Sequence, residues 1–190
     1  MLGPEAAANA IAKLLEGNVP TKIVALRARL GLAVDDLESP REYLAHDEPE
    51  LALDRWPAVL VVPQGMSSIQ LVDVVDGASV YECTYQLRTF VFYREQDFTA
   101  TARGRDRLTL AVREVILESL SAGTSGARID PTSLRESYSE TDREDARTIA
   151  GAYVDLDLTL TESLAPEIIG QVETAVPQVT AIISTGGDDE

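Results

Sequence analysis

Residues 80–94 read VYECTYQLRTFVFYR, and this stretch decides the fold. Its odd positions are mostly apolar from Tyr81 to Tyr93, whereas its even positions are polar from Glu82 to Arg88. Alternation with a period of two is typical of a β-strand with one buried face. The stretch therefore predicts a long strand that other elements cover on one side.

An amphipathic helix is predicted directly after this strand, from about Phe98 to Leu120. Asp97 or Thr99 is placed to cap its first turn. The apolar residues at helical spacing, which we expect to pack against the strand, are Leu108, Val112, Val115 and Ile116. The arginines, expected mostly on the exposed sides, are Arg103, Arg105, Arg107 and Arg113.

Three further segments predict strands of the same sheet. Residues 58–62 are a short apolar run bounded by prolines, and residues 69–75 form a second candidate strand. Asp76-Gly77 is a strong hairpin signal because Gly accepts the positive φ of a tight turn, so 69–75 should pair antiparallel with 80–94. Residues 149–162 alternate again, with even positions apolar from Ala150 to Leu160.

The remaining segments complete the predicted order. Residues 4–31 predict a helix in two pieces, with a stop at Gly17-Asn18 and Pro20 in the first turn of the second piece. Residues 32–55 form an acidic connection that carries a short strand near Tyr43. Residues 127–139 are strand-like, and residues 141–147 are a charged turn.

These elements predict an α/β (α+β) domain over residues 1–164. Its sheet should be small, mixed and mostly antiparallel, with a β-hairpin and with helices packed on one face. Residues 165–190 are expected to form a C-terminal arm. They keep seven aliphatic residues between Ile168 and Ile183, which a disordered tail rarely does, so the arm docks either on its own domain or on a neighbouring subunit.

The charge of the chain argues against a protein that grips nucleic acid. The formal net charge is -16, and a DNA binder needs basic surface for the phosphates. Such an acidic surface is compatible with simple solubility or with a surface that repels passing DNA. The sequence contains neither an apolar run long enough for a membrane span nor a secretion signal, so synthesis in the host cytoplasm is expected.

No motif carries catalytic chemistry, and no cofactor or metal is predicted. Cys83 and His46 are single residues of their kinds, and Cys83 is expected to be a buried thiol. Asp155 and Asp157 share one face of a strand, where they could bind a metal, but the polar face of an amphipathic strand explains them as well. The alternative that this leaves open is a metal-dependent hydrolase.

Four groups of residues carry a resemblance to a known family. They are ALDRWPAV at 52–59, YQLRTFV at 85–91, RDRL at 105–108 with Arg113-Glu114, and LRESY at 134–138 with GAYV at 151–154. In these groups the chain resembles the tail terminator proteins of long-tailed phages (siphoviruses) that infect actinobacteria. The resemblance covers about Ala6 to Leu164.

The resemblance implies a structural protein of the virion rather than an enzyme. Family members form a hexameric ring on the head-proximal end of the tail tube, where they stop polymerisation and join the tube to the neck. The implied partners are further copies of the chain, the major tail tube protein and a neck connector protein, with the genome passing through the ring without specific binding. Another head–tail connector protein is the alternative within the same class.

Candidate interface residues come from the segment around the single Trp, from the long strand and from the arm. Trp and Arg are enriched where interfaces bind most strongly, although a Trp at the edge of a core is the more common outcome. The candidates are Arg55, Trp56, Phe90, Phe92, Ile168, Ile169, Val172, Ile182 and Ile183.

Overall fold

The computed structural model describes residues 3–46, 55–120, 127–144 and 147–164. The fold is mixed α+β, as the sequence predicts. Its elements are α1 (Gly3–Leu30), the 3-10 helix η1 (Val34–Asp36), β1 (Glu42–Leu44), β2 (Ala58–Val75), β3 (Ala78–Glu95), α2 (Phe98–Glu118), β4 (Ala127–Tyr138), β5 (Asp142–Glu144) and β6 (Arg147–Leu164).

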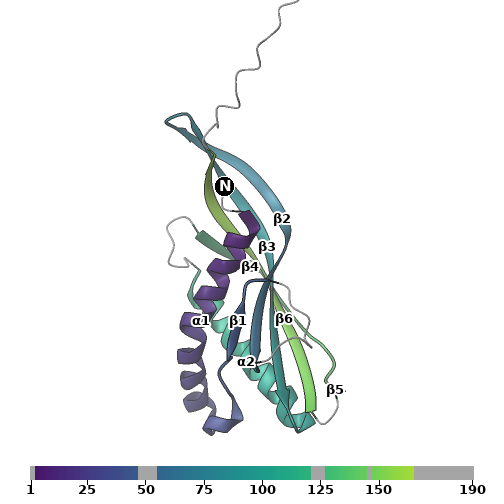
Figure 1. The fold of residues 1–190 in the computed structure, drawn as a ribbon. Coiled ribbons are helices and arrows are strands. Elements are labelled where there is room, and N and C mark those ends of the chain that lie inside the picture. Colours follow the sequence, from purple (N-terminus) through teal and green to yellow (C-terminus); the bar gives the residue numbers. More distant parts are fainter. Residues whose placement is uncertain (1–2, 47–54, 121–126, 145–146, 165–190) are drawn as a thin grey trace, which may run out of the picture.

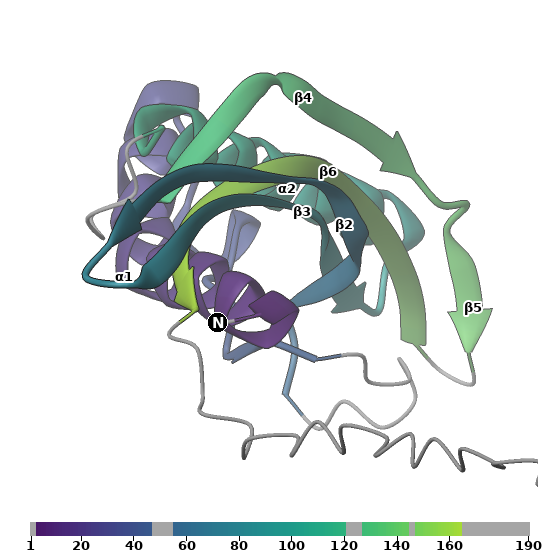
Figure 2. The ribbon, with the colours of Figure 1, turned by 90° about the horizontal axis from the view of Figure 1, so that it is seen from above.

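One sheet contains all the described strands. Its order is β1-β2-β3-β6-β4, and β5 pairs with β6 beside β4. Every pair is antiparallel except β1 with β2. Figure 1 shows both helices on the same side of the long strands, and the view from above in Figure 2 shows how strongly β2, β3 and β6 curve. The predicted short strand near Tyr43 is confirmed as β1.

The predicted break in the first helix is wrong, because α1 continues through Gly17 and Pro20. A glycine inside a helix costs about 1 kcal/mol and a proline about 3 kcal/mol. Against this, Leu15, Val19 and Ile23 are fully buried, and each such side chain contributes roughly 1.5–3 kcal/mol. Tertiary burial of the apolar stripe therefore outweighs the local signals for a stop.

The two strands predicted at 58–62 and 69–75 are one continuous strand, β2. The pairing of β2 with β3 contains three shifts of register, and the first of them lies between Pro63 and Gly65. Pro63 has no N–H for the ladder, which makes such an irregularity the natural place for it. The predicted turn is confirmed: Asp76 and Gly77 both have positive φ, at 52° and 79°, as a two-residue hairpin turn requires.

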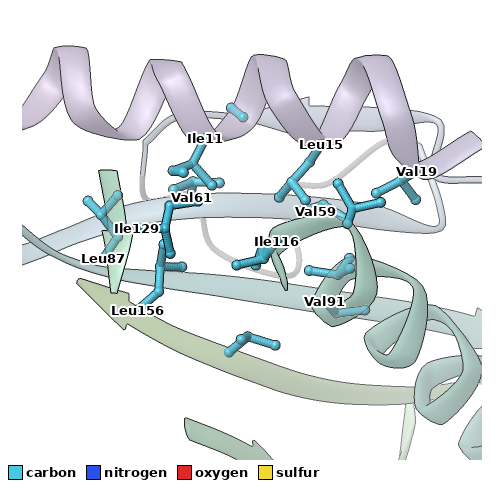
Figure 3. Close-up of a cluster of buried hydrophobic side chains, with 14 of the residues drawn as sticks. Ile11, Leu15, Val19, Val59, Val61, Leu87, Val91, Ile116, Ile129 and Leu156 are labelled. Atoms are coloured by element: carbon cyan, nitrogen blue, oxygen red, sulfur yellow. The ribbon is translucent and has the colours of Figure 1, made fainter. Parts of the chain in front are cut away.

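The core lies between the helices and one face of the sheet. In Figure 3, Ile11 and Leu15 of α1 point toward Val59 and Val61 of β2. Side chains of α2, β3, β4 and β6 complete the cluster, namely Ile116, Leu87, Val91, Ile129 and Leu156. The predicted covering of one face by helices is therefore correct.

The second helix follows its prediction closely, with one exception. Asp97 is the N-cap, and its Oδ2 accepts the N–H of Ala100 at 2.7 Å. Arg105, expected on an exposed side, is instead buried, and its Nη1 donates to the carbonyl of Ser139 at 2.7 Å. Gly104 lets the ring of Tyr93 approach, since a Cβ there would lie 2.2 Å from Cε1 of the ring.

Two other predictions on the C-terminal half have different outcomes. The charged turn at 141–147 is wrong in part, because β5 extends the sheet along β6 there. The arm at 165–190 lies outside the described residues. Within the described part of the chain, no helix is long and apolar enough to cross a membrane.

Candidate interaction surfaces

The β2–β3 hairpin projects beyond the first turn of α1 (Figure 1), and its distal part exposes apolar side chains. Residues 64–77 are all exposed. Its large aliphatic side chains, each about half exposed, are Met66, Ile69, Leu71, Val72, Val74 and Val75. Single exposed apolar residues are ordinary, but a contiguous group of them marks a surface that binds another molecule.

The sequence predicted this hairpin but not its side chains as candidate site residues. The signal was present in residues 71–75, which read LVDVV. That run has apolar residues at both even and odd positions, so neither face of the strand is polar. An apolar strand at the end of a hairpin, beyond the reach of the helices, leaves both faces in solvent.

Phe90 and Phe92 lie on the face of the sheet opposite the helices. Val91 and Tyr93 belong to the core beneath the helices, and successive residues of a strand point to opposite sides. Phe90 and Phe92 are stacked with their ring centroids 5.8 Å apart. Trp56 meets Phe92 edge-on at 6.2 Å.

These rings belong to a small second core on this face of the sheet. Phe92 is only 5% exposed and packs with Ala58 and Leu60, whereas Phe90 and Trp56 are partly buried. At the other end, Phe90 meets Tyr153 of β6 edge-on at 6.1 Å. The structure thus brings three predicted interface residues together in one aromatic row, defined here as Trp56, Phe92, Phe90 and Tyr153.

Arg88 closes one end of the aromatic row. Its guanidinium lies 3.9 Å from the centre of the Tyr153 ring and donates to both carboxylate oxygens of Asp155, at 2.7 and 2.9 Å. The hydrogen bonds to Asp155 raise the pKa of Arg88 above its usual value. A two-pronged contact of this kind fixes both side chains, and it occupies the oxygens of Asp155 that a metal would need.

Asp157 shares this face but has a different environment. Burial raises the pKa of its carboxyl group, and the negative charge of Asp130 raises it further. Asp155 and Asp157 both lie half-buried on the face of β6 opposite the core, which is the polar face that the alternation predicts. No group of three or more His, Cys, Asp or Glu side chains suited to a metal occurs among the described residues.

Arg94 lies at the opposite end of the aromatic row, with its guanidinium 5.5 Å from the centre of the Trp56 ring. The two side chains border a cavity of about 310 Å³ between the beginning of β2 and the end of β3. Arg55, a predicted interface residue, is exposed and lines the same cavity. The remaining candidates, Ile168, Ile169, Val172, Ile182 and Ile183, lie outside the described residues.

A buried carboxylate ties the first helix to the sheet. Glu162 of β6 is 2% exposed; its Oε1 accepts the hydroxyl of Tyr85 at 2.6 Å and the N–H of Gly3 at 3.4 Å. Burial and the bond to Glu162 raise the pKa of Tyr85. A negative charge at the first turn of a helix is favourable because of the helix dipole.

Sequence reasoning missed Glu162, although a signal existed. Its even number places it on the buried face of β6, in line with Leu158 and Leu160. A charged residue at a buried position of an alternating strand requires a partner, and Tyr85 on the neighbouring strand supplies it. Cys83 is buried as predicted, and burial raises the pKa of its thiol.

Comparison with known proteins adds no family to this geometry. No protein-family model matches the chain, and no curated protein matches it either.

Proposed function

We propose that this protein is a tail terminator of a long-tailed phage. In this proposal it forms a closed ring, of six copies by the family resemblance, on the head-proximal end of the finished tail tube. There it ends tube polymerisation and provides the surface that joins the neck, without catalysis or cofactor. The observation that carries the proposal is the projecting β2–β3 hairpin with its exposed aliphatic side chains.

The hairpin supports assembly because its apolar surface has no partner within the described part of the protomer. Full burial of an aliphatic side chain contributes roughly 1.5–3 kcal/mol, so each half-exposed one retains about 1 kcal/mol. The six side chains together offer about 6 kcal/mol. A micromolar contact needs about 8 kcal/mol, in addition to the cost of association.

The hairpin therefore needs further surface to hold a ring together. The exposed part of the aromatic row and the outer edge of β4 are available for this. A closed ring requires that two different surfaces of the protomer meet, with a rotation that closes. The hairpin of one copy and the sheet of the next form such a pair.

The acidity of the chain provides a second support. A net charge of -16 in each copy would repel the genome as it passes through the ring and keep it from sticking. Basic lining would instead trap DNA through release of its counterions. We expect carboxylates to line part of the channel.

The test is the mass and the binding partner of the purified protein. The protomer has a mass of 20.5 kDa, so a six-membered ring should have a mass of about 123 kDa. Added to purified tail tubes, the protein should bind at one end and stop further growth there. A chain that remains a monomer and binds no tube would contradict the proposal, and a ring that binds the capsid portal but not the tube would make it a connector.

A further inference from the structure

The cavity next to Trp56 concentrates positive charge in an otherwise acidic chain. Among the described residues, its charged lining consists of Arg41, Arg55 and Arg94 together with Glu38 and Glu95. Three of the 16 basic residues thus line one cavity of about 310 Å³. Arg41 is paired with Glu38 at 2.8 Å, whereas no ion pair of Arg55 or Arg94 is found among the described residues.

Arg94 lies over the Trp56 ring and has a buried nitrogen atom without a partner among the described residues. Its Nε is buried and has no hydrogen-bond partner among the described residues. The contact with the face of Trp56 holds the guanidinium in place without using its N–H groups. A guanidinium that lines a cavity can donate two parallel hydrogen bonds to one carboxylate.

The charge of the whole chain favours a peptide carboxylate over a nucleic acid as the ligand. A phosphate backbone that approached one small basic cavity would meet repulsion from the rest of the surface, which carries a net -16. A short acidic segment brings few charges and can enter the cavity alone. Its aliphatic neighbours could contact the Trp56 ring at the rim.

We propose that this cavity binds the acidic segment Asp188-Asp189-Glu190 of a second copy of the chain. This inference rests on the proposed function, because it requires that copies assemble. Residues 165–190 contain five acidic residues and no basic ones, and two glycines precede the last three residues. The cavity and this segment are therefore complementary in charge, and each occurs once in a copy.

The length of the segment allows a contact between copies. Leu164, the last described residue, pairs with Ser79 at the hairpin end of the sheet, whereas Arg94 lies near the opposite end of β3. An extended segment of 26 residues reaches about 85 Å, which exceeds the roughly 60 Å of an 18-residue strand. A segment with that reach can leave its own copy and enter the cavity of a neighbouring copy in a ring.

The test uses Trp56, the only Trp of the chain, as a fluorescent probe in the cavity. The protein in this test is the full chain with D188N, D189N and E190Q, so that its own acidic segment does not compete with the added peptide. The probe is a synthetic peptide of residues 178–190, compared with the same peptide carrying those three substitutions. The acidic peptide should change Trp56 fluorescence with saturation, and raising the salt from about 0.05 M to about 0.3 M should weaken binding.

Substitutions in the cavity identify the contact. Arg94→Gln and Arg55→Gln should each weaken peptide binding roughly tenfold or more, and Arg94→Lys should weaken it less, because Lys keeps the charge but not the two-pronged geometry. Arg128→Gln is the matched control, since Arg128 is exposed on β4 and does not line the cavity. This control should bind the peptide as tightly as the chain without a substitution in the cavity.

Three results of the peptide titration would overturn the inference. They are no response to the acidic peptide, an equal response to the neutral peptide, and equal weakening by Arg128→Gln. The mass of the assembly, measured for the wild-type chain and for Arg94→Gln in the chain that keeps its acidic segment, keeps this test apart from that of the proposed function. Rings that form equally well with Arg94→Gln would refute the inference alone, whereas a monomeric wild-type chain would refute the proposed function.

Discussion

The hairpin surface yields the sharpest prediction, the double substitution Leu71→Ser and Val74→Ser. Leu71 is 53% and Val74 57% exposed, so each still has about half of its side chain to bury in a contact. Loss of that burial should cost about 1–1.5 kcal/mol for each residue. Together the two changes should weaken each protomer–protomer contact by about 2–3 kcal/mol, which corresponds to roughly 30- to 150-fold in the dissociation constant.

The assay is the mass of the protein as a function of its concentration, measured by sedimentation. The double variant should need a concentration at least tenfold higher than the wild type to assemble, by the same conversion of energy into affinity. Both changes are on exposed positions, so the thermal unfolding temperature should stay nearly unchanged. This separates a loss of contact from a loss of fold.

Val24→Ser is the matched control for the hairpin variant. Val24 is 62% exposed on α1, so the substitution removes similar apolar surface from a place far from the hairpin. The control should assemble like the wild type. A double variant that assembles at the wild-type concentration would refute this prediction, and so would a Val24→Ser variant whose assembly is weakened just as much.

Three further predictions concern the core, the carboxylate face and the C-terminal segment. Leu156→Ala, at a fully buried position of β6, should destabilise the fold by roughly 2–5 kcal/mol in urea unfolding, and a cost below about 0.5 kcal/mol would show that the site is not tightly packed. Asp157 has a raised pKa, so the folded state keeps a proton that the unfolded state releases, and stability falls as the pH rises from about 4 toward the raised value. Asp157→Asn should remove that fall in unfolding curves taken at several pH values, and an unchanged pH profile would count against it. Deletion of residues 165–190 should leave a folded domain with weaker assembly, as seen by circular dichroism and sedimentation, whereas an unfolded product would assign the segment to its own core.

Alternation and turn chemistry predicted most of the sheet. The period of two in residues 80–94 and 149–162 depends only on which face is buried, and both stretches became long central strands. Asp76-Gly77 fixed the hairpin because few other pairs adopt two consecutive positive φ angles. Signals of this kind are local, so one sequence is enough to detect them.

The errors came from places where tertiary packing overrides local preference. Gly17 and Pro20 are ordinary helix breakers, yet the buried stripe of α1 carries the helix through them. The prolines that bound residues 58–62 predict the end of a strand at Pro63, but β2 passes it with a shift of register. The burial of several large side chains together outweighs such local preferences, and burial depends on partners that are distant in sequence.

The candidate site was predictable only in part for the same reason. Trp56, Phe90 and Phe92 were chosen individually, and their meeting in one row follows from the pairing of β2 with β3. The sequence does not predict Arg94 as a site residue, because its contact with the Trp56 ring and the lack of a partner for its Nε among the described residues depend on how the ends of two strands meet. The direction of a side chain can be predicted from alternation, whereas its neighbours require the register.

The most direct measurement of the central claim is the length of tails made in infected cells from which this protein is withheld. We expect tails of irregular or excessive length that fail to join filled heads, with the defect reversed by supplying the wild-type chain. The Leu71→Ser and Val74→Ser variant should restore it poorly, and Val24→Ser should restore it fully. Tails of normal length that join heads without the protein would contradict the account.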